Sequence, residues 1–244
     1  MKTSGGSDAT KRRAGESAAE AVTDGDVVGL GTGSTAAHAI RRLGDRVDAG
    51  LGVRGVPTSF ASRELAAEEA IPCLDLPEAV GPDGPGIDLA IDGADQVATG
   101  SEGSDSPVPG GALIKGGGAA HAREKLVDAA ADRFLVVADP SKESPRLDRS
   151  VPVEVLPAGR TAVAAAVREA GGEATLRRAE RKDGPVVTDN GNLVVDCAFG
   201  DIADPAGLSA TLSASPGVVE HGLFVGLADE VHVGTESGVR IDEV

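Results

Sequence analysis

The sequence predicts an α/β protein built on a doubly wound parallel sheet with a second, smaller α+β domain. Up to about residue 143, short apolar runs alternate with helical patterns, as in repeated strand–helix units. Four of these runs end in polar turns: GTGST, PTS, DGAD and DPSK. Beyond Pro145 the pattern changes to apolar runs around an Asn-Gly turn, which is a hairpin signal.

The first part of the chain contains the elements of the parallel sheet. Alanine-rich or amphipathic segments favour helices, and short runs of Val, Ile and Leu favour buried strands. We expect helices at 11–22, 36–43, 62–70 and 119–131, and strands at 27–31, 51–56, 71–76, 87–91 and 134–138. Residues 77–86 and 98–110 are expected to be loops.

The remainder of the chain supplies the second domain. We expect strands at 151–156, 174–180, 186–189 and 193–199, and helices at 160–170 and 204–212. Final strands at 222–225 and 230–233 are expected to return to the first domain. The predicted boundaries are 1–147 plus 222–244 for the first domain and 148–221 for the second.

Composition and charge restrict the functional classes. Apolar residues make up 41% of the 244 residues, which indicates a globular chain. No apolar run approaches the ~20 residues that a membrane span needs. The net charge of −16 argues against nucleic acid and anionic membranes as partners. The N-terminus lacks an apolar secretory segment and there are only two cysteines, so we expect a cytoplasmic protein with reduced thiols.

The form of the acidity points to a saline cytoplasm. Asp and Glu total 39, against six lysines and 17 arginines. Such an excess destabilises a compact state by self-repulsion, which concentrated salt screens. We therefore expect a halophilic protein, the alternative being an ordinary acidic soluble enzyme.

The four polar turns should lie at one edge of the sheet, where doubly wound folds bind ligands. The GTGST turn, residues 31–35, leads into a helix whose N–H groups and dipole favour an anion. Ser34 and Thr35 are also expected to cap that helix. The turn fits the loose dinucleotide pattern G-x-G-x-x-A, but that reading requires an acid at the end of the next strand. Residues 57–59, PTS, stand there instead, and their hydroxyls suit phosphate better.

A stretch in the middle of the chain concentrates groups that can move protons on a small anionic substrate. Asp92 and Asp95 follow an apolar run. Lys115 precedes three glycines, and Glu124 lies nine residues further on. Other interpretations stay open, because the aspartates also suit an Asx-type turn and Glu124, between two basic residues, also suits a solvated helix face. His121 is expected on a helix surface.

Seven motifs occur in one order: GLGTGST, IDGADQV, IKGGGAAHAREK, VVADPSK, VPVEVLP, TDNGNLVVD and PGVVEHGLF. Together they resemble the type A ribose-5-phosphate isomerase family over nearly the whole chain. The resemblance implies a Rossmann-like domain with a small ferredoxin-like lid domain, assembled as a homodimer or homotetramer. It also implies interconversion of ribose 5-phosphate and ribulose 5-phosphate in pentose phosphate metabolism, without cofactor or metal.

The resemblance also implies a set of site residues. Glu124 matches the family's catalytic base, and the other catalytic groups fall on Asp92, Asp95 and Lys115. The matched substrate-binding residues are Thr32, Gly33, Ser34, Thr35, Asp92, Gly93, Ala94, Asp95, Lys115, Gly116, Gly117, Gly118 and Lys142. An N-terminal lysine of the family falls on Lys11. The chain departs from the family at Gln96, where an acid is usual, and in a longer loop at 98–110.

Two other functional classes are compatible with this kind of fold. One is a non-catalytic sugar-phosphate sensor, which keeps the phosphate loop and can lose the base. The other is a different enzyme, such as an amino-sugar-phosphate deaminase or a CoA transferase, and fold alone does not choose among these. The combination of two aspartates, a lysine and a glutamate favours the isomerase.

Overall fold

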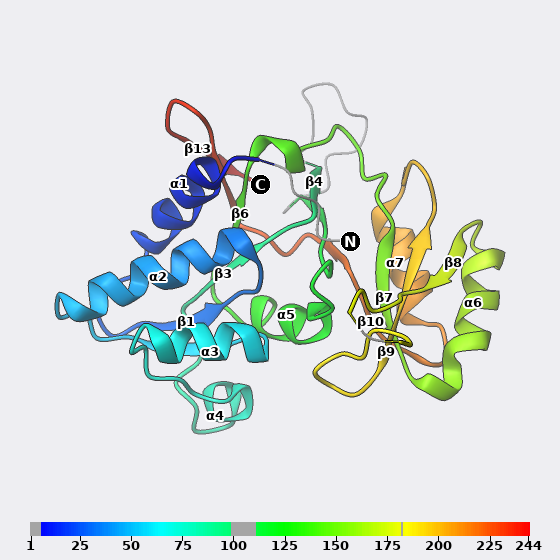
Figure 1. The fold of residues 1–244 in the computed structure, drawn as a ribbon, viewed down its shortest axis with the longest axis horizontal. Coiled ribbons are helices and arrows are strands. Elements are labelled where there is room, and N and C mark those ends of the chain that lie inside the picture. The colour runs from blue at the N-terminus through cyan, green and yellow to red at the C-terminus, as the bar shows by residue number, and fades with distance from the viewer. Residues whose placement is uncertain (1–5, 99–110, 182) are drawn as a thin grey trace. The chain divides into compact units, whose positions relative to one another are not determined.

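The computed structural model describes residues 6–98, 111–181 and 183–244, and the chain forms two compact units (Figure 1). The large unit contains residues up to 94 together with 123–143 and 227–244. The small unit contains the described parts of 95–122 and 144–226. Most of the loop expected at 98–110 lies outside the described residues. In the part of the chain that is described, no helix is both long and apolar enough to cross a bilayer.

The large unit is organised around a six-stranded sheet with the order β13-β12-β6-β3-β1-β2. Its strands are β1 (Val27–Leu30), β2 (Arg54–Pro57), β3 (Leu89–Gly93), β6 (Phe134–Ala138), β12 (Glu230–Gly234) and β13 (Val239–Glu243). All neighbours are parallel except β13, which runs antiparallel to β12. The predicted doubly wound parallel sheet is therefore confirmed, and β12 joins it as a late strand.

Helices cover both faces of this sheet (Figure 1). On one face, α1 (Asp8–Ala19), α2 (Ser34–Asp48) and α3 (Phe60–Glu68) enclose an apolar core with alternate residues of β1, β3 and β6. On the other face, α5 (His121–Asp128) packs its Val127 against β1. A Cβ at Gly29 would lie only 2.7 Å from Val127, so the missing side chain lets this helix approach the strand.

The strand expected at 71–76 is wrong. Only a single bridge forms there, between Cys73 and Gly55, and α4 (Leu76–Val80) begins where the strand was expected to end. Pro72 has no N–H to donate to a ladder. The side chains of Asp75 and Glu78 form a capping box that starts the helix.

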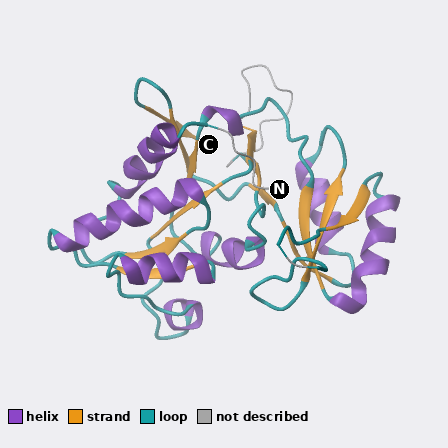
Figure 2. Cartoon of the chain, in the orientation of Figure 1, coloured by secondary structure: helices purple, strands orange, loops and turns teal. Residues whose placement is uncertain are grey.

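The small unit contains a four-stranded antiparallel sheet with the order β10-β7-β9-β8. The strands are β7 (Val151–Val155), β8 (Glu173–Leu176), β9 (Leu193–Ala198) and β10 (Val218–His221). Helices α6 (Arg160–Glu169) and α7 (Pro205–Ser213) pack against it (Figure 2). The strand expected at 186–189 is wrong, since these residues make only one isolated bridge, between Val187 and Leu193 across the Asn-Gly turn.

A second sheet in the small unit has the order β11-β5-β4. Its strands are β4 (Gln96–Ala98), β5 (Ala112–Ile114) and β11 (Leu223–Val225). Both pairings are antiparallel. Asp95 directly precedes β4 and Lys115 directly follows β5, so this sheet positions two of the expected site residues.

Candidate active site

The turn between β1 and α2 has the geometry of an anion site. Gly33 is the N-cap residue, with φ +122, a conformation that favours glycine. The capping role expected for Ser34 and Thr35 is wrong, because no side chain among the described residues makes a cap hydrogen bond here. The first-turn N–H groups of a helix have no intrahelical acceptor, so they remain suited to an anionic ligand.

Hydroxyl groups connect this turn to the one that follows β2. The Thr32 hydroxyl lies 2.8 Å from Thr58 Oγ1 and donates to Ser59 Oγ at 2.7 Å. Thr58 in turn donates its backbone N–H to the Leu30 carbonyl at 3.0 Å. The GTGST and PTS turns therefore form one hydroxyl-rich edge, as expected for a phosphate site.

Asp92 lies at the end of β3 and is completely buried. Its Oδ1 accepts N–H groups from Thr32 at 3.0 Å and from Gly93 at 2.6 Å. A Cβ at Gly31 would overlap the Asp92 carboxyl group, so glycine is required for this approach. The structure thus brings Thr32 and Asp92 together, and the carboxylate fixes the backbone of the GTGST turn.

Glu124 and Lys142 lie on two further elements of the large unit. Glu124 is in the first turn of α5, where the helix dipole favours a carboxylate, and is only 4% exposed. The alternative of a solvated helix face is therefore wrong for Glu124. Lys142 ends a short 3₁₀ helix, η1 (Pro140–Lys142), and is also buried. Asp139 starts that turn by accepting the Ser141 N–H at 2.9 Å.

In the small unit, Asp95 is joined to the glycine loop. Its backbone N–H donates to the Ile114 carbonyl at 2.8 Å, and its Oδ2 accepts the Gly117 N–H at 2.6 Å. Gly116 has φ +101, and a Cβ at Gly117 would lie 2.6 Å from Asp95 Oδ1. Two of the three glycines are therefore required, one by backbone conformation and one by the approach of Asp95.

The Lys115 side chain is 2% exposed, although it carries an ammonium group. Its Nζ lies 5.4 Å from the centroid of the Phe224 ring on β11, which is a favourable cation–π distance. Its backbone N–H donates to the Gly222 carbonyl at 2.9 Å. Contacts with Gly222, just before β11, and with Phe224, within β11, therefore hold the backbone and the charged end of Lys115.

The positions of two residues near the glycine loop, His121 and Arg177, were not expected from the sequence. His121 is completely buried, so the expected surface position is wrong, and its Nε2 accepts the Glu154 N–H at 3.1 Å. Arg177 donates to the carbonyl of Gly116 at 2.8 Å and forms an ion pair with Asp196. Arg177 lies 61 residues from Gly116 in the chain, so no local spacing indicates this contact.

Comparison with known proteins identifies the family. A family model described as ribose 5-phosphate isomerase A (phosphoriboisomerase A) matches residues 54–238. The chain belongs to this family. The family recognised from the sequence motifs is thereby confirmed, as is the assignment to the isomerases.

Relatives named ribose-5-phosphate isomerase A match over the full length. The protein of Halorubrum lacusprofundi is 82% identical over 99% of both chains. The protein of Haloarcula marismortui is 66% identical, over 97% of this chain and 96% of its own. Both organisms are halophilic archaea, which agrees with the salt adaptation expected from the charge.

Solved ribose 5-phosphate isomerases share the fold. The enzyme of Methanocaldococcus jannaschii has a TM-score of 0.86 and 42% identity, over 96% of this chain and 98% of its own. A D-ribose-5-phosphate isomerase solved in complex with phospho-erythronic acid has a TM-score of 0.87 and 38% identity, with the same coverage. The expected fold class is therefore confirmed at the level of the family.

Proposed function

We propose that this chain interconverts D-ribose 5-phosphate and D-ribulose 5-phosphate through an enediolate. The observation that carries the proposal is the burial of Glu124 within the AREK motif of a ribose 5-phosphate isomerase A family member. A carboxylate at this position can take a proton from one carbon and return it to its neighbour. General-base catalysis of this kind contributes about 10²–10⁴ in rate.

The remaining groups of the proposal have complementary roles. Asp92 and Asp95 open the furanose ring and move protons between the two substrate oxygens. Lys115 stabilises the oxyanion that develops as the enediolate forms, which is the kind of preorganised electrostatic contribution that is often largest. Its low exposure supports this role, since a charge acts more strongly where water is excluded.

The phosphate is proposed to bind at the N-terminus of α2. The N–H groups there and the hydroxyls of Thr32 and Ser34 suit its oxygens. Binding of this remote group supplies free energy that orients the sugar at the reacting carbons. The proposed substrate-binding set is completed by Gly33, Thr35, Gly93, Ala94, the loop 116–118 and Lys142.

Assembly and location are part of the same proposal. We expect a homodimer or homotetramer in the cytoplasm, with residues 148–221 acting as a lid or assembly domain. The family membership and the absence of a spanning helix among the described residues support this reading. Light scattering in molar KCl measures the oligomer number directly.

The test is ribulose 5-phosphate formation from ribose 5-phosphate, measured in molar KCl with EDTA for the wild type and Glu124→Gln. Removing the base is expected to lower kcat by at least about 100-fold. Asp128→Asn is the matched control, because Asp128 is also buried and lies one turn further along α5. We expect the control to retain most of its activity.

Each outcome has a distinct meaning. Equal losses in Glu124→Gln and Asp128→Asn would refute Glu124 as the base. A folded wild type that binds ribose 5-phosphate without converting it would refute the isomerase and favour a sugar-phosphate sensor. Circular dichroism of each variant in the same salt establishes that the loss is not one of folding.

A further inference from the structure

We propose that Arg177 is a positioning residue that holds the Asp95 carboxylate through the Gly116–Gly117 peptide group. Arg177 follows β8, and all four residues belong to the small unit. The inference rests on the proposed function, because it assigns to Arg177 an effect on the turnover in which Asp95 takes part. Arg177, in the region expected to form the lid, would thus orient Asp95 through an intervening peptide group.

The guanidinium group of Arg177 is divided between two sets of acceptors. Its Nη1 donates to the carbonyl oxygens of Gly116 at 2.8 Å and Gly117 at 3.3 Å. Its Nε donates to Asp196 Oδ2 at 2.9 Å, and its Nη2 donates to Asp196 Oδ1. The bidentate ion pair fixes the plane of the guanidinium, and this plane aims the remaining nitrogen at the glycine loop.

A single peptide group connects Arg177 to Asp95. Its carbonyl belongs to Gly116 and accepts from Arg177, while its N–H belongs to Gly117 and donates to Asp95 Oδ2 at 2.6 Å. In a trans peptide the C=O and N–H point in opposite directions, so the cation and the carboxylate lie at opposite ends of one dipole. Hydrogen bonds in such a chain polarise and strengthen one another.

The loop needs this external support because its own backbone is permissive. Gly116 has φ +101, and glycine populates such conformations as readily as others. Arg177, by contrast, is held by backbone hydrogen bonds on both sides, donating to Val194 at 2.9 Å and accepting from Val186 at 3.0 Å. Its side chain is only 10% exposed. The rigid partner therefore determines the orientation of the flexible peptide.

A double-mutant cycle tests the inference. Arg177→Met, Asp95→Asn and the double variant are assayed with ribose 5-phosphate in molar KCl. Arg177→Met is expected to lower kcat by about 10- to 100-fold, the size of effect that a small misplacement of a reacting group produces. KM should change less than about threefold, because an interaction used in turnover rather than in substrate binding is lost. The double variant should be no slower than Asp95→Asn alone.

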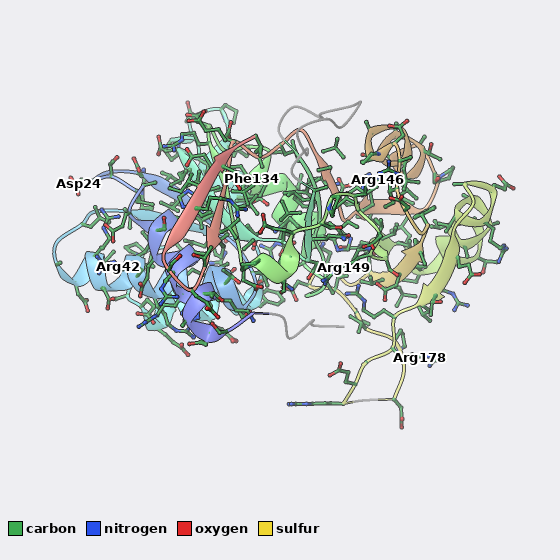
Figure 3. The ribbon with its side chains drawn as sticks, turned by 90° about the horizontal axis from the view of Figure 1, so that it is seen from above. Asp24, Arg42, Phe134, Arg146, Arg149 and Arg178 are labelled. Carbon is green, nitrogen blue, oxygen red and sulfur yellow. The ribbon has the colours of Figure 1, made fainter. Side chains whose placement is uncertain are left out.

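The matched control is Arg178→Met, since Arg178 is the adjacent residue and is exposed (Figure 3). It removes the same charge and should leave kcat within about twofold of the wild type. Equal kcat values for Arg177→Met and Arg178→Met would overturn the inference, and so would fully additive losses in the cycle of Arg177→Met with Asp95→Asn. Neither result would affect the assignment as an isomerase. An inactive wild type would instead refute the proposed function.

A second substitution covers the case in which Arg177→Met does not fold. Arg177→Lys keeps the charge but cannot bind Asp196 through two nitrogens and the Gly116 carbonyl through a third. We expect this variant to fold and to lose kcat by about 3- to 10-fold, with the same non-additivity toward Asp95→Asn. Wild-type kcat in a folded Arg177→Lys would overturn the requirement for the guanidinium.

Discussion

Thr32 and Asp92, 60 residues apart in the chain, are joined by a hydrogen bond of 3.0 Å from the Thr32 N–H to Asp92 Oδ1. The bond connects the turn after β1 to the end of β3, which are neighbouring strands. A carboxylate that accepts a backbone N–H forms a charge-assisted bond, stronger than a neutral one. One of the proposed acid groups therefore also organises the proposed phosphate turn.

Gly31→Ala should disrupt this arrangement. The added Cβ would overlap the Asp92 carboxyl group. The preceding residues, Leu30 and Ile91, are paired in the sheet, so the backbone cannot easily move apart. We expect a loss of about 1–3 kcal/mol in the free energy of unfolding, as for other overpacked sites, together with a large loss of isomerase activity. Urea unfolding in molar KCl and steady-state assays measure the two effects.

Gly50→Ala is the control for this substitution. Gly50 has φ +104 with open space around the position of a Cβ, so alanine there adds backbone strain without a clash. It should lose about 1–2 kcal/mol of stability and keep its activity. If Gly31→Ala also kept full activity, the position of Asp92 would not matter for turnover.

Gln96→Glu should destabilise this chain. The Gln96 amide donates to Asp148 Oδ1 at 2.6 Å, and its carbonyl oxygen accepts N–H groups from Asp148 and Arg149 at 3.0 Å. A carboxylate cannot donate, and it would face the Asp148 carboxylate at a buried position. We expect a loss of about 1–3 kcal/mol in the free energy of unfolding, measured with urea.

The same contact supplies the rescue. Asp148→Asn in the Gln96→Glu background restores a donor opposite an acceptor, so most of the lost stability should return. Asp148→Asn alone should cost less than Gln96→Glu. A double variant as unstable as Gln96→Glu would show that the cost comes from elsewhere than this pair.

Glu154 should stabilise the turn at 188–192. Its buried Oε1 accepts from the Thr188 hydroxyl at 2.9 Å and from the side-chain amides of Asn190 at 3.0 Å and Asn192 at 2.8 Å. Glu154→Gln keeps the shape but removes the charge, so we expect a loss of about 1–2 kcal/mol in unfolding free energy. Glu154→Ala leaves all three donors without this acceptor and should lose more. Equal stability of the two variants in urea would contradict the network.

Protonation of His232 should make the fold less stable below about pH 6.5. Burial lowers the pKa of His232 below its ordinary value, although the Glu230 carboxylate opposes the shift and Arg133 adds to it. The unfolded chain then binds a proton that the folded chain does not, so stability is present above the ordinary histidine pKa of about 6.5 and is lost as the pH falls. One proton accounts for at most about 1.4 kcal/mol per pH unit.

Urea unfolding at pH 7.5 and pH 5.5 measures this effect. His232→Gln retains a donor for Glu230 Oε2, which lies 3.1 Å from His232 Nε2, but cannot titrate. The loss of stability between the two pH values should therefore be smaller in the variant. An unchanged pH dependence would assign the effect to other groups. Burial raises the pKa of Glu230, but hydrogen bonds from Arg133 and His232 outweigh it, so the pKa is lowered overall. Glu230 therefore changes the pH dependence of stability only in more acidic solution than this range.

Much of the parallel sheet and several positions of the candidate site follow from the sequence alone. Alternation of apolar runs with helical patterns is a local property, and it locates β1, β3 and β6 to within about two residues. The rule that ligands bind at the carboxyl ends of parallel strands then directs attention to Asp92 and the turn at 31–35. The motifs identify the family for the same reason, since each is a short segment with its own chemistry.

Only the tertiary structure decided which distant groups support those segments. The sequence did not indicate that Glu124 and His121 are buried, that β11 pairs with β5, or that Arg177 binds the Gly116 carbonyl. Burial depends on what packs over a helix, and strand pairing depends on the path of the whole chain. A backbone carbonyl is the same acceptor at every residue, so its partner cannot be read from residue types.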